Sequence, residues 1–134
     1  MNFFIKQHST LPVLKYYLKE DVLRKHHITD DMFESVAVTF SMFNPKTNTF
    51  IIANKQADLH INDDRVQRGL NGEPKYILVY RFSEKDTKNI GDYKAEFVVD
   101  FMGYYGCGKI KFPIGSGEDI NVVVSESITK TTVV

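Results

Sequence analysis

The chain has 134 residues, with 17 Lys and Arg balanced by 17 Asp and Glu, so its formal net charge is zero. This length fits one domain with a sizeable apolar core, and the charge balance argues against nucleic acid as a partner. The single cysteine, Cys107, excludes an intramolecular disulfide and a cysteine-based zinc cage.

Alternation of apolar and polar side chains predicts strands along most of the chain. Val38, Phe40 and Met42 fall on one face of residues 36–43, with smaller or polar groups mostly on the other. Residues 44–48 contain a proline and two asparagines, which favours a hairpin turn after this strand. In chain order the expected strands are residues 3–6, 11–18, 36–43, 49–54, 76–82, 93–101, 109–114 and 119–125.

One segment departs from strand spacing. Within residues 20–35, Val22, Leu23, Met32 and Phe33 recur at roughly helical intervals. We therefore expect one or two short helical turns there. No stretch approaches the roughly 20 apolar residues that a membrane span requires, so we expect no membrane partner.

Seven or eight short strands at this spacing predict an all-β fold, an immunoglobulin-like antiparallel β-sandwich. The whole chain, residues 1–134, is expected to form this single domain. Residues 126–134 keep strand-like composition beyond the last core strand, so we expect them to form a C-terminal arm. A frayed chain end is the alternative reading of that segment.

The glycine-rich stretch 103–109 superficially resembles a phosphate-binding loop. Such a loop needs a following helix and a Ser or Thr after the lysine, whereas Ile110 and a strand follow here. We interpret the stretch as a hairpin with Tyr104 and Tyr105 at its tip. Cys107 has no recognisable histidine and acid partners, so we expect a packed thiol, and we predict no catalytic residue and no cofactor.

Asp58 and His60 are the strongest candidates for metal ligands. Alternate residues of a strand face the same way, so a carboxylate, an imidazole and the pair Asp63-Asp64 can approach one divalent ion. A solvated strand face explains these residues as well, so no metal is assigned.

Residues 80–101 carry a recognisable pattern. Asp86-Thr87, followed by Gly91, Tyr93 and the run Ala95-Glu96-Phe97, resembles the signature of the immunoglobulin-like domain at the N-terminus of phage baseplate upper proteins. Residues 4–14, 36–42, 112–113 and 120–124 are similar to other strands of that family in the same order. The resemblance spans most of the chain, and residues 20–35 and 106–108 depart from the family's pattern.

The resemblance implies a non-enzymatic structural protein of a phage virion, in its tail, baseplate or neck. We expect multiple symmetric copies, assembled in the host cytoplasm, with other virion structural proteins as partners. Docking would proceed through sheet edges and terminal arms. The residues expected at this assembly interface are Phe3, Phe4, Ile128, Thr129, Thr131, Thr132, Val133 and Val134.

Two alternative functions remain open. One is a capsid-surface decoration protein. The other is an accessory module that binds a host glycan through Tyr104, Tyr105 and residues 62–74, since sandwich folds carry many unrelated sites. An enzyme is the least supported class, because no motif supplies a nucleophile, a base or a metal centre.

Overall fold

The computed structural model describes residues 1–62, 74–102, 108–115 and 118–128. These residues form eight strands, one α-helix and one 3₁₀-helix, so the all-β prediction is confirmed. The elements are β1 (Asn2–Lys6), β2 (Leu14–Leu18), α1 (Glu20–Lys25), η1 (Asp30–Glu34), β3 (Val36–Asn44), β4 (Thr49–Ile61), β5 (Tyr76–Tyr80), β6 (Gly91–Phe101), β7 (Lys109–Phe112) and β8 (Ile120–Ser125).

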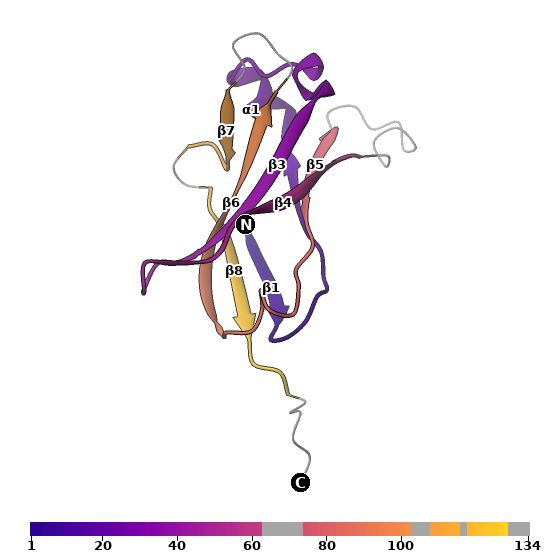
Figure 1. The fold of residues 1–134 in the computed structure, drawn as a ribbon. Helices are drawn as coiled ribbons and strands as arrows, with labels where there is room; N and C mark the ends of the chain where they lie inside the picture. Colours follow the sequence, from indigo (N-terminus) through magenta and orange to yellow (C-terminus); the bar gives the residue numbers. More distant parts are fainter. Residues whose placement is uncertain (63–73, 103–107, 116–117, 129–134) are drawn as a thin grey trace.

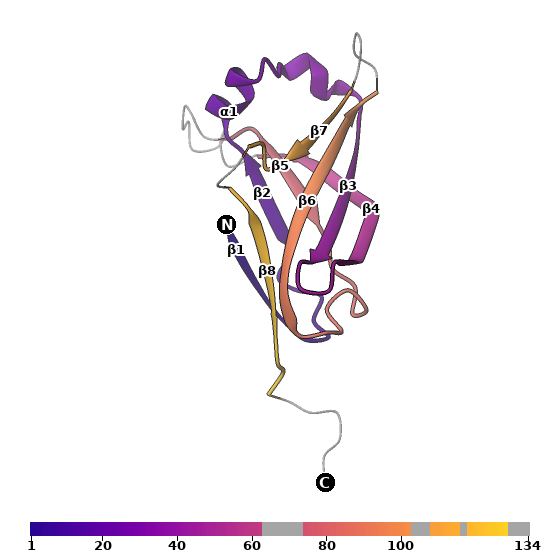
Figure 2. The ribbon, with the colours of Figure 1, turned by 90° about the vertical axis from the view of Figure 1, so that its left-hand side faces the viewer.

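The strands form one sheet in the order β1-β8-β6-β3-β4-β5-β2, and β7 pairs with β6 beside β8 (Figure 1). The long strand β4 pairs with β3 up to Ala57 and with β5 from Asp58 onward. It therefore joins the two parts of the curled sheet, one made of β1, β8, β6 and β3 and the other of β5 and β2. The sheet curls over on itself, so that β2 lies across from β6 and β7 (Figure 2). The centroid of the Tyr16 ring lies 6.4 Å from that of Phe97 and 6.5 Å from that of Phe112.

The predicted strand ends match the structure to within two residues, apart from those of two strands, and the direction of one strand pair differs. The predicted helical turns within residues 20–35 are confirmed as α1 and η1, at one end of the sheet. β4 continues to Ile61, well beyond the predicted end at residue 54, while β2 begins only at Leu14. The expectation of a purely antiparallel sheet was wrong for one pair, since β1 runs parallel to β8. These two strands come from opposite ends of the chain, so no hairpin imposes an antiparallel arrangement.

Stacked aromatic rings fill the interior. The Phe40 ring lies 4.2 Å from Tyr80 and 4.9 Å from Phe97, and all three side chains are buried. In β6, Tyr93 and Phe97 point inward as predicted, while Glu96 between them lies partly exposed on the outer face. Each fully buried side chain of this kind contributes about 1.5–3 kcal/mol to folding. The alternation of apolar and polar residues along each strand thus decides which side chains form the core.

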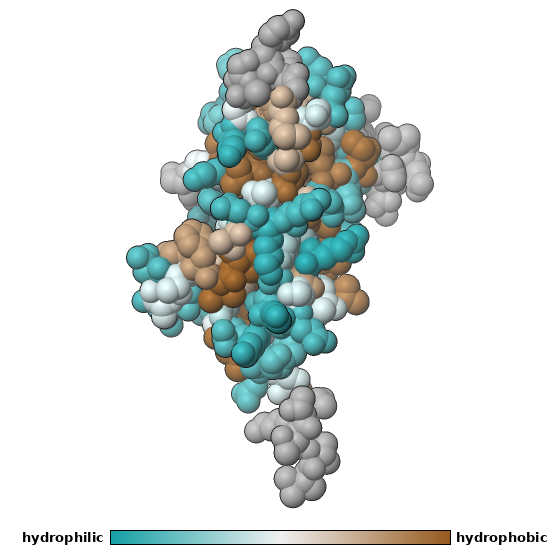
Figure 3. All heavy atoms as spheres, in the orientation of Figure 1, coloured by the Kyte–Doolittle hydropathy of each residue, from teal (hydrophilic) through white to brown (hydrophobic). Residues whose placement is uncertain are grey.

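The surface is mixed in polarity. Figure 3 shows apolar patches between hydrophilic side chains on the face that it draws. Among the described residues, no helix has the length and apolar character needed to cross a bilayer. The exposed large apolar residues in this part of the chain are Met1, Phe4, Leu11, Tyr17, Phe50, Ile61, Ile90, Met102 and Ile128.

Candidate functional site

The candidate site is the outer edge of β1. Among the described residues, no strand other than β8 pairs with β1. The Asn121 amide donates to the Met1 carbonyl at 2.9 Å, and the Gln7 amide donates to the Ser125 carbonyl at 2.8 Å. Backbone groups of alternate residues in a strand point the same way, so those of residues 3 and 5 also face β8. The backbone groups of residues 2, 4 and 6 therefore face away from β8, and of these the Lys6 carbonyl already accepts the Ser9 amide at 3.1 Å.

Side chains on β1 divide in the same alternating way. Phe3 is only 9% exposed and its ring stacks on Phe82 at 5.6 Å, whereas Phe4 is 64% exposed. Phe3 was expected at the assembly interface, and the structure instead places its ring in the core of its own chain. Phe4 is the aromatic side chain that this edge presents to solvent.

The chain continues past β8 as Glu126, Ser127 and Ile128, which lead away from the sheet (Figure 1). The Ile128 side chain is 91% exposed, so it remains available to a partner. The other predicted interface residues, Thr129, Thr131, Thr132, Val133 and Val134, lie outside the described residues. The same holds for Tyr104 and Tyr105, predicted as loop-tip contacts, and for Cys107.

The two candidate metal ligands, Asp58 and His60, lie on β4, and both are exposed. Asp63 and Asp64 fall outside the described residues. Within the described ranges, no group of three or more His, Cys, Asp or Glu side chains is arranged to hold a metal ion.

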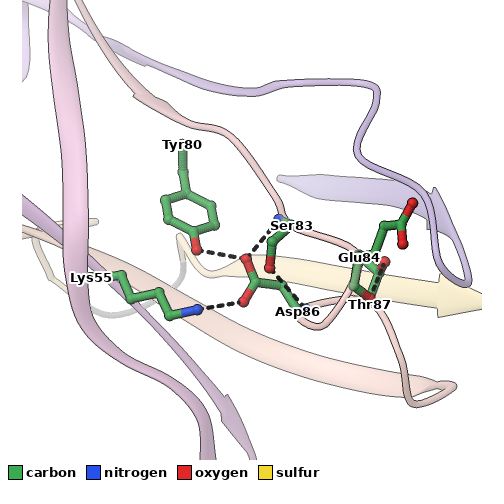
Figure 4. Close-up of polar contacts among 6 residues, drawn as sticks. All are labelled: Lys55, Tyr80, Ser83, Glu84, Asp86 and Thr87. Carbon is green, nitrogen blue, oxygen red and sulfur yellow. Dashed lines mark hydrogen bonds and ion pairs between the residues drawn. The ribbon is translucent and has the colours of Figure 1, made fainter.

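The carboxylate of Asp86, for which the sequence predicts no specific contact, is buried in the turn that follows β5. One of its oxygens accepts the Tyr80 hydroxyl at 2.7 Å and the Ser83 amide at 2.9 Å (Figure 4). The other accepts the Lys55 ammonium at 2.9 Å. The carboxylate thus joins β4, β5 and the connection between β5 and β6. We call these four residues the Asp86 cluster.

Charge and burial compete at this cluster. Burial by itself raises the pKa of the Asp86 carboxyl, but hydrogen bonds from Ser83, Tyr80 and Lys55 and the Lys55 charge outweigh burial and hold that pKa below its usual range. Burial, together with the hydrogen bond to Asp86 and its charge, raises the pKa of Tyr80. The carboxyl is therefore ionised near neutral pH, and the phenol keeps the proton that it donates.

The turn held by Asp86 also supports the segment that follows β1. The Thr87 hydroxyl donates to the Ser9 carbonyl at 2.9 Å, and the His8 amide donates to the Thr87 carbonyl at 3.1 Å. The Gln7 side-chain amide donates to the Lys88 carbonyl at 2.8 Å. Residues 7–9 are therefore tied to residues 87–88 at three points. The sequence signal for this arrangement is the Asp-Thr pair of the family-like pattern.

An exposed edge of this kind can accept another extended segment. Its outward amides and carbonyls can form main-chain hydrogen bonds, and Phe4 adds apolar contact area beside them.

Comparison of the chain with protein-family models, with curated protein sequences and with solved structures finds no match in any of the three.

Replacing Asp86 with Asn tests the cluster. Asn keeps the shape of the side chain but removes its charge and turns one acceptor into a donor that faces other donors. We expect Asp86→Asn to lower the free energy of unfolding by about 2–4 kcal/mol, measured by urea denaturation. Glu84→Gln is the matched control, because Glu84 is exposed and only its backbone carbonyl contacts Thr87. A loss equal to that of the control would contradict this role.

The lowered pKa of Asp86 also predicts a dependence on pH. An unfolded Asp has a pKa of about 3.9, so the stabilisation from the ionised group is complete above that pH and is lost as the pH falls through the lower folded pKa. The difference in unfolding free energy between the wild type and Asp86→Asn should be constant from about pH 6 to 8 and shrink below about pH 4. Denaturation curves across this range measure it, and a difference unchanged at low pH would exclude the ionised carboxylate as its source.

Proposed function

We propose that this chain is a non-enzymatic structural protein of a phage virion, located in its tail, baseplate or neck. We further propose that its curled sheet is the immunoglobulin-like sandwich of the baseplate upper protein family. The protein would work by docking onto neighbouring virion proteins, in multiple symmetric copies. The observation that carries this proposal is the outer edge of β1, which pairs with no strand in the part of the chain that the structure describes and has Phe4 exposed on it.

The resemblance supports the fold proposal at the positions where it is most specific. Tyr93 and Phe97 are buried in β6, and the Tyr93 hydroxyl donates to the Asn89 carbonyl at 2.7 Å. A side chain at Gly91 would place its Cβ 3.2 Å from the Tyr93 hydroxyl oxygen, which explains a glycine there. These residues of the family-like pattern therefore serve packing.

Two of the strands at the edges of the sheet, β7 and β1, differ in a way that supports the docking proposal. Proteins usually protect an exposed sheet edge with charged side chains, especially lysine. β7, which pairs only with β6 among the described residues, carries exposed Lys109 and Lys111 within its four residues. β1 instead presents Phe4 at its centre, between Asn2 and Lys6. An apolar residue in this position favours pairing with a partner strand.

The energy of such pairing is sufficient for assembly when many copies engage together. Each added main-chain hydrogen bond contributes about 0.5–1.5 kcal/mol net, and burying Phe4 contributes up to about 1.5–3 kcal/mol. Ile128, exposed beyond the end of β8, offers a second apolar contact. Repeated weak contacts of this kind add up in a symmetric particle.

The direct test is to purify particles of the phage that encodes this chain. We expect mass spectrometry to detect the protein in them, and cryo-electron microscopy to place it in an ordered ring or lattice with β1 or residues 126–134 against a neighbouring chain. A position on the capsid surface would favour the decoration alternative. Absence from particles would overturn the structural role.

A substitution at the edge tests the mode of docking. Phe4→Pro removes an outward amide that β8 does not use, and Phe4→Lys places a charge where an apolar contact is proposed. We expect each variant to reduce incorporation into particles by about tenfold, which corresponds to about 1.4 kcal/mol per contact. Ile90→Lys is the control, because Ile90 is 53% exposed and lies outside the strands. Normal incorporation of folded Phe4→Lys protein would exclude this edge as the contact.

A further inference from the structure

A row of side chains crosses the outer face of the sheet from β1 to the β3–β4 hairpin. The register pairs Asn2 with Asn121, Asn121 with Lys94, Lys94 with Phe43, and Phe43 with Phe50. Hydrogen bonds join the three polar side chains of this row. The Lys94 ammonium donates to the Asn121 side-chain oxygen, and the Asn121 side-chain amide donates to the Asn2 side-chain oxygen at 3.0 Å. The row therefore begins polar at the sheet edge and ends in two aromatic rings.

These two rings form a platform outside the core. The Phe43 and Phe50 rings lie 5.2 Å apart and are inclined by 56°. Phe50 is 61% exposed, although a Phe side chain is among the most costly to leave in water. Contact with Phe43 stabilises the hairpin, but it leaves most of the Phe50 side chain uncovered.

A hollow of about 420 Å³ lies beside this platform. Its size falls within the range of small-ligand sites, roughly 300–1,000 Å³. Apolar lining comes from the two rings, Ala95 and Pro113, and polar lining comes from Ser41, Lys94, Glu96, Glu118 and Asp119.

The charges around the hollow are paired with one another. Lys94 lies 3.2 Å from Asp119, Lys19 lies 3.4 Å from Glu118, and Lys111 lies 4.0 Å from Glu96. Lys94 lines the hollow, whereas Lys19 and Lys111 lie just outside its lining. With these two lysines counted, three cations balance three carboxylates, so the surroundings of the hollow carry no net charge. The rim does offer both hydrogen-bond donors and acceptors next to an aromatic face.

We propose that this hollow binds a neutral saccharide. A pyranose ring has an apolar face of C–H groups that can lie on the electron-rich face of Phe50. Its hydroxyl groups both donate and accept, so they can bridge the lysine and carboxylate side chains of the rim without adding net charge. An apolar peptide segment would remove these exposed ion pairs from water without offering them hydrogen bonds, which disfavours it.

This site is separate from the docking edge. Phe50 and Asn2 stand at opposite ends of the row, with three strands between theirs. Saccharide binding can therefore be measured on the isolated chain, and its result is independent of whether the protein is found in virions.

The test is a screen of the 134-residue chain on a glycan array containing neutral and anionic oligosaccharides. A nuclear magnetic resonance titration with the best neutral tetrasaccharide then locates the site. We expect binding to neutral glycans, with shifts in the amides of Ala95, Glu96 and Gly115. Phe50→Ala should weaken binding about tenfold or more, Glu96→Ala should also weaken it, and Phe50→Tyr should retain it because the platform remains.

Tyr17→Ala serves as the matched control, since Tyr17 is 45% exposed on β2 and lies outside the hollow. Its affinity for the glycan should equal that of the wild type. The proposal is overturned if no neutral glycan binds, if only anionic glycans bind, or if the shifts map elsewhere. It is also overturned if Phe50→Ala and Glu96→Ala, both folded by circular dichroism, bind as tightly as the wild type.

Discussion

The buried carboxylate of Asp86 is the interaction on which the arrangement of this protein depends most. Removing a carboxylate from water costs several kcal/mol, so its place is favourable only when its partners are all present. Tyr80, Ser83 and Lys55 supply these partners from β5, the following turn and β4. The network therefore specifies how the two parts of the curled sheet meet, and misplacing one member penalises the others.

The turn that contains Asp86 also contacts the segment that follows β1, the strand proposed for docking. Thr87 and Lys88 hold the residues after β1 by hydrogen bonds, so the path of the chain leaving the edge strand is fixed by a buried charge. An edge that is held rigidly loses less conformational entropy when a partner strand pairs with it. The interior and the proposed docking edge are thus parts of one hydrogen-bonded arrangement.

The two proposed contact surfaces use different chemistry on one sheet. The edge of β1 offers backbone groups with Phe4, which suits another extended chain. The hollow beside Phe50 offers an aromatic platform with balanced charges, which suits a neutral polyhydroxyl ligand. Because the strands between them keep the two apart, a structural protein can dock through its edge and keep the outer face open.

The sequence alone determined the strand-rich class, most strand positions and the inward Tyr93 and Phe97, because these follow from the strand-like alternation of apolar side chains. It also determined the helical turns within residues 20–35, where apolar side chains recur at helical intervals. Only the tertiary structure decided that β1 runs parallel to β8, and that Phe3 packs inside while Phe4 faces solvent. It alone also revealed the Asp86 cluster and the row that ends at Phe50. These features join residues far apart in the chain, and the pairing of distant strands is fixed by the packing of the whole sheet, which no local pattern encodes.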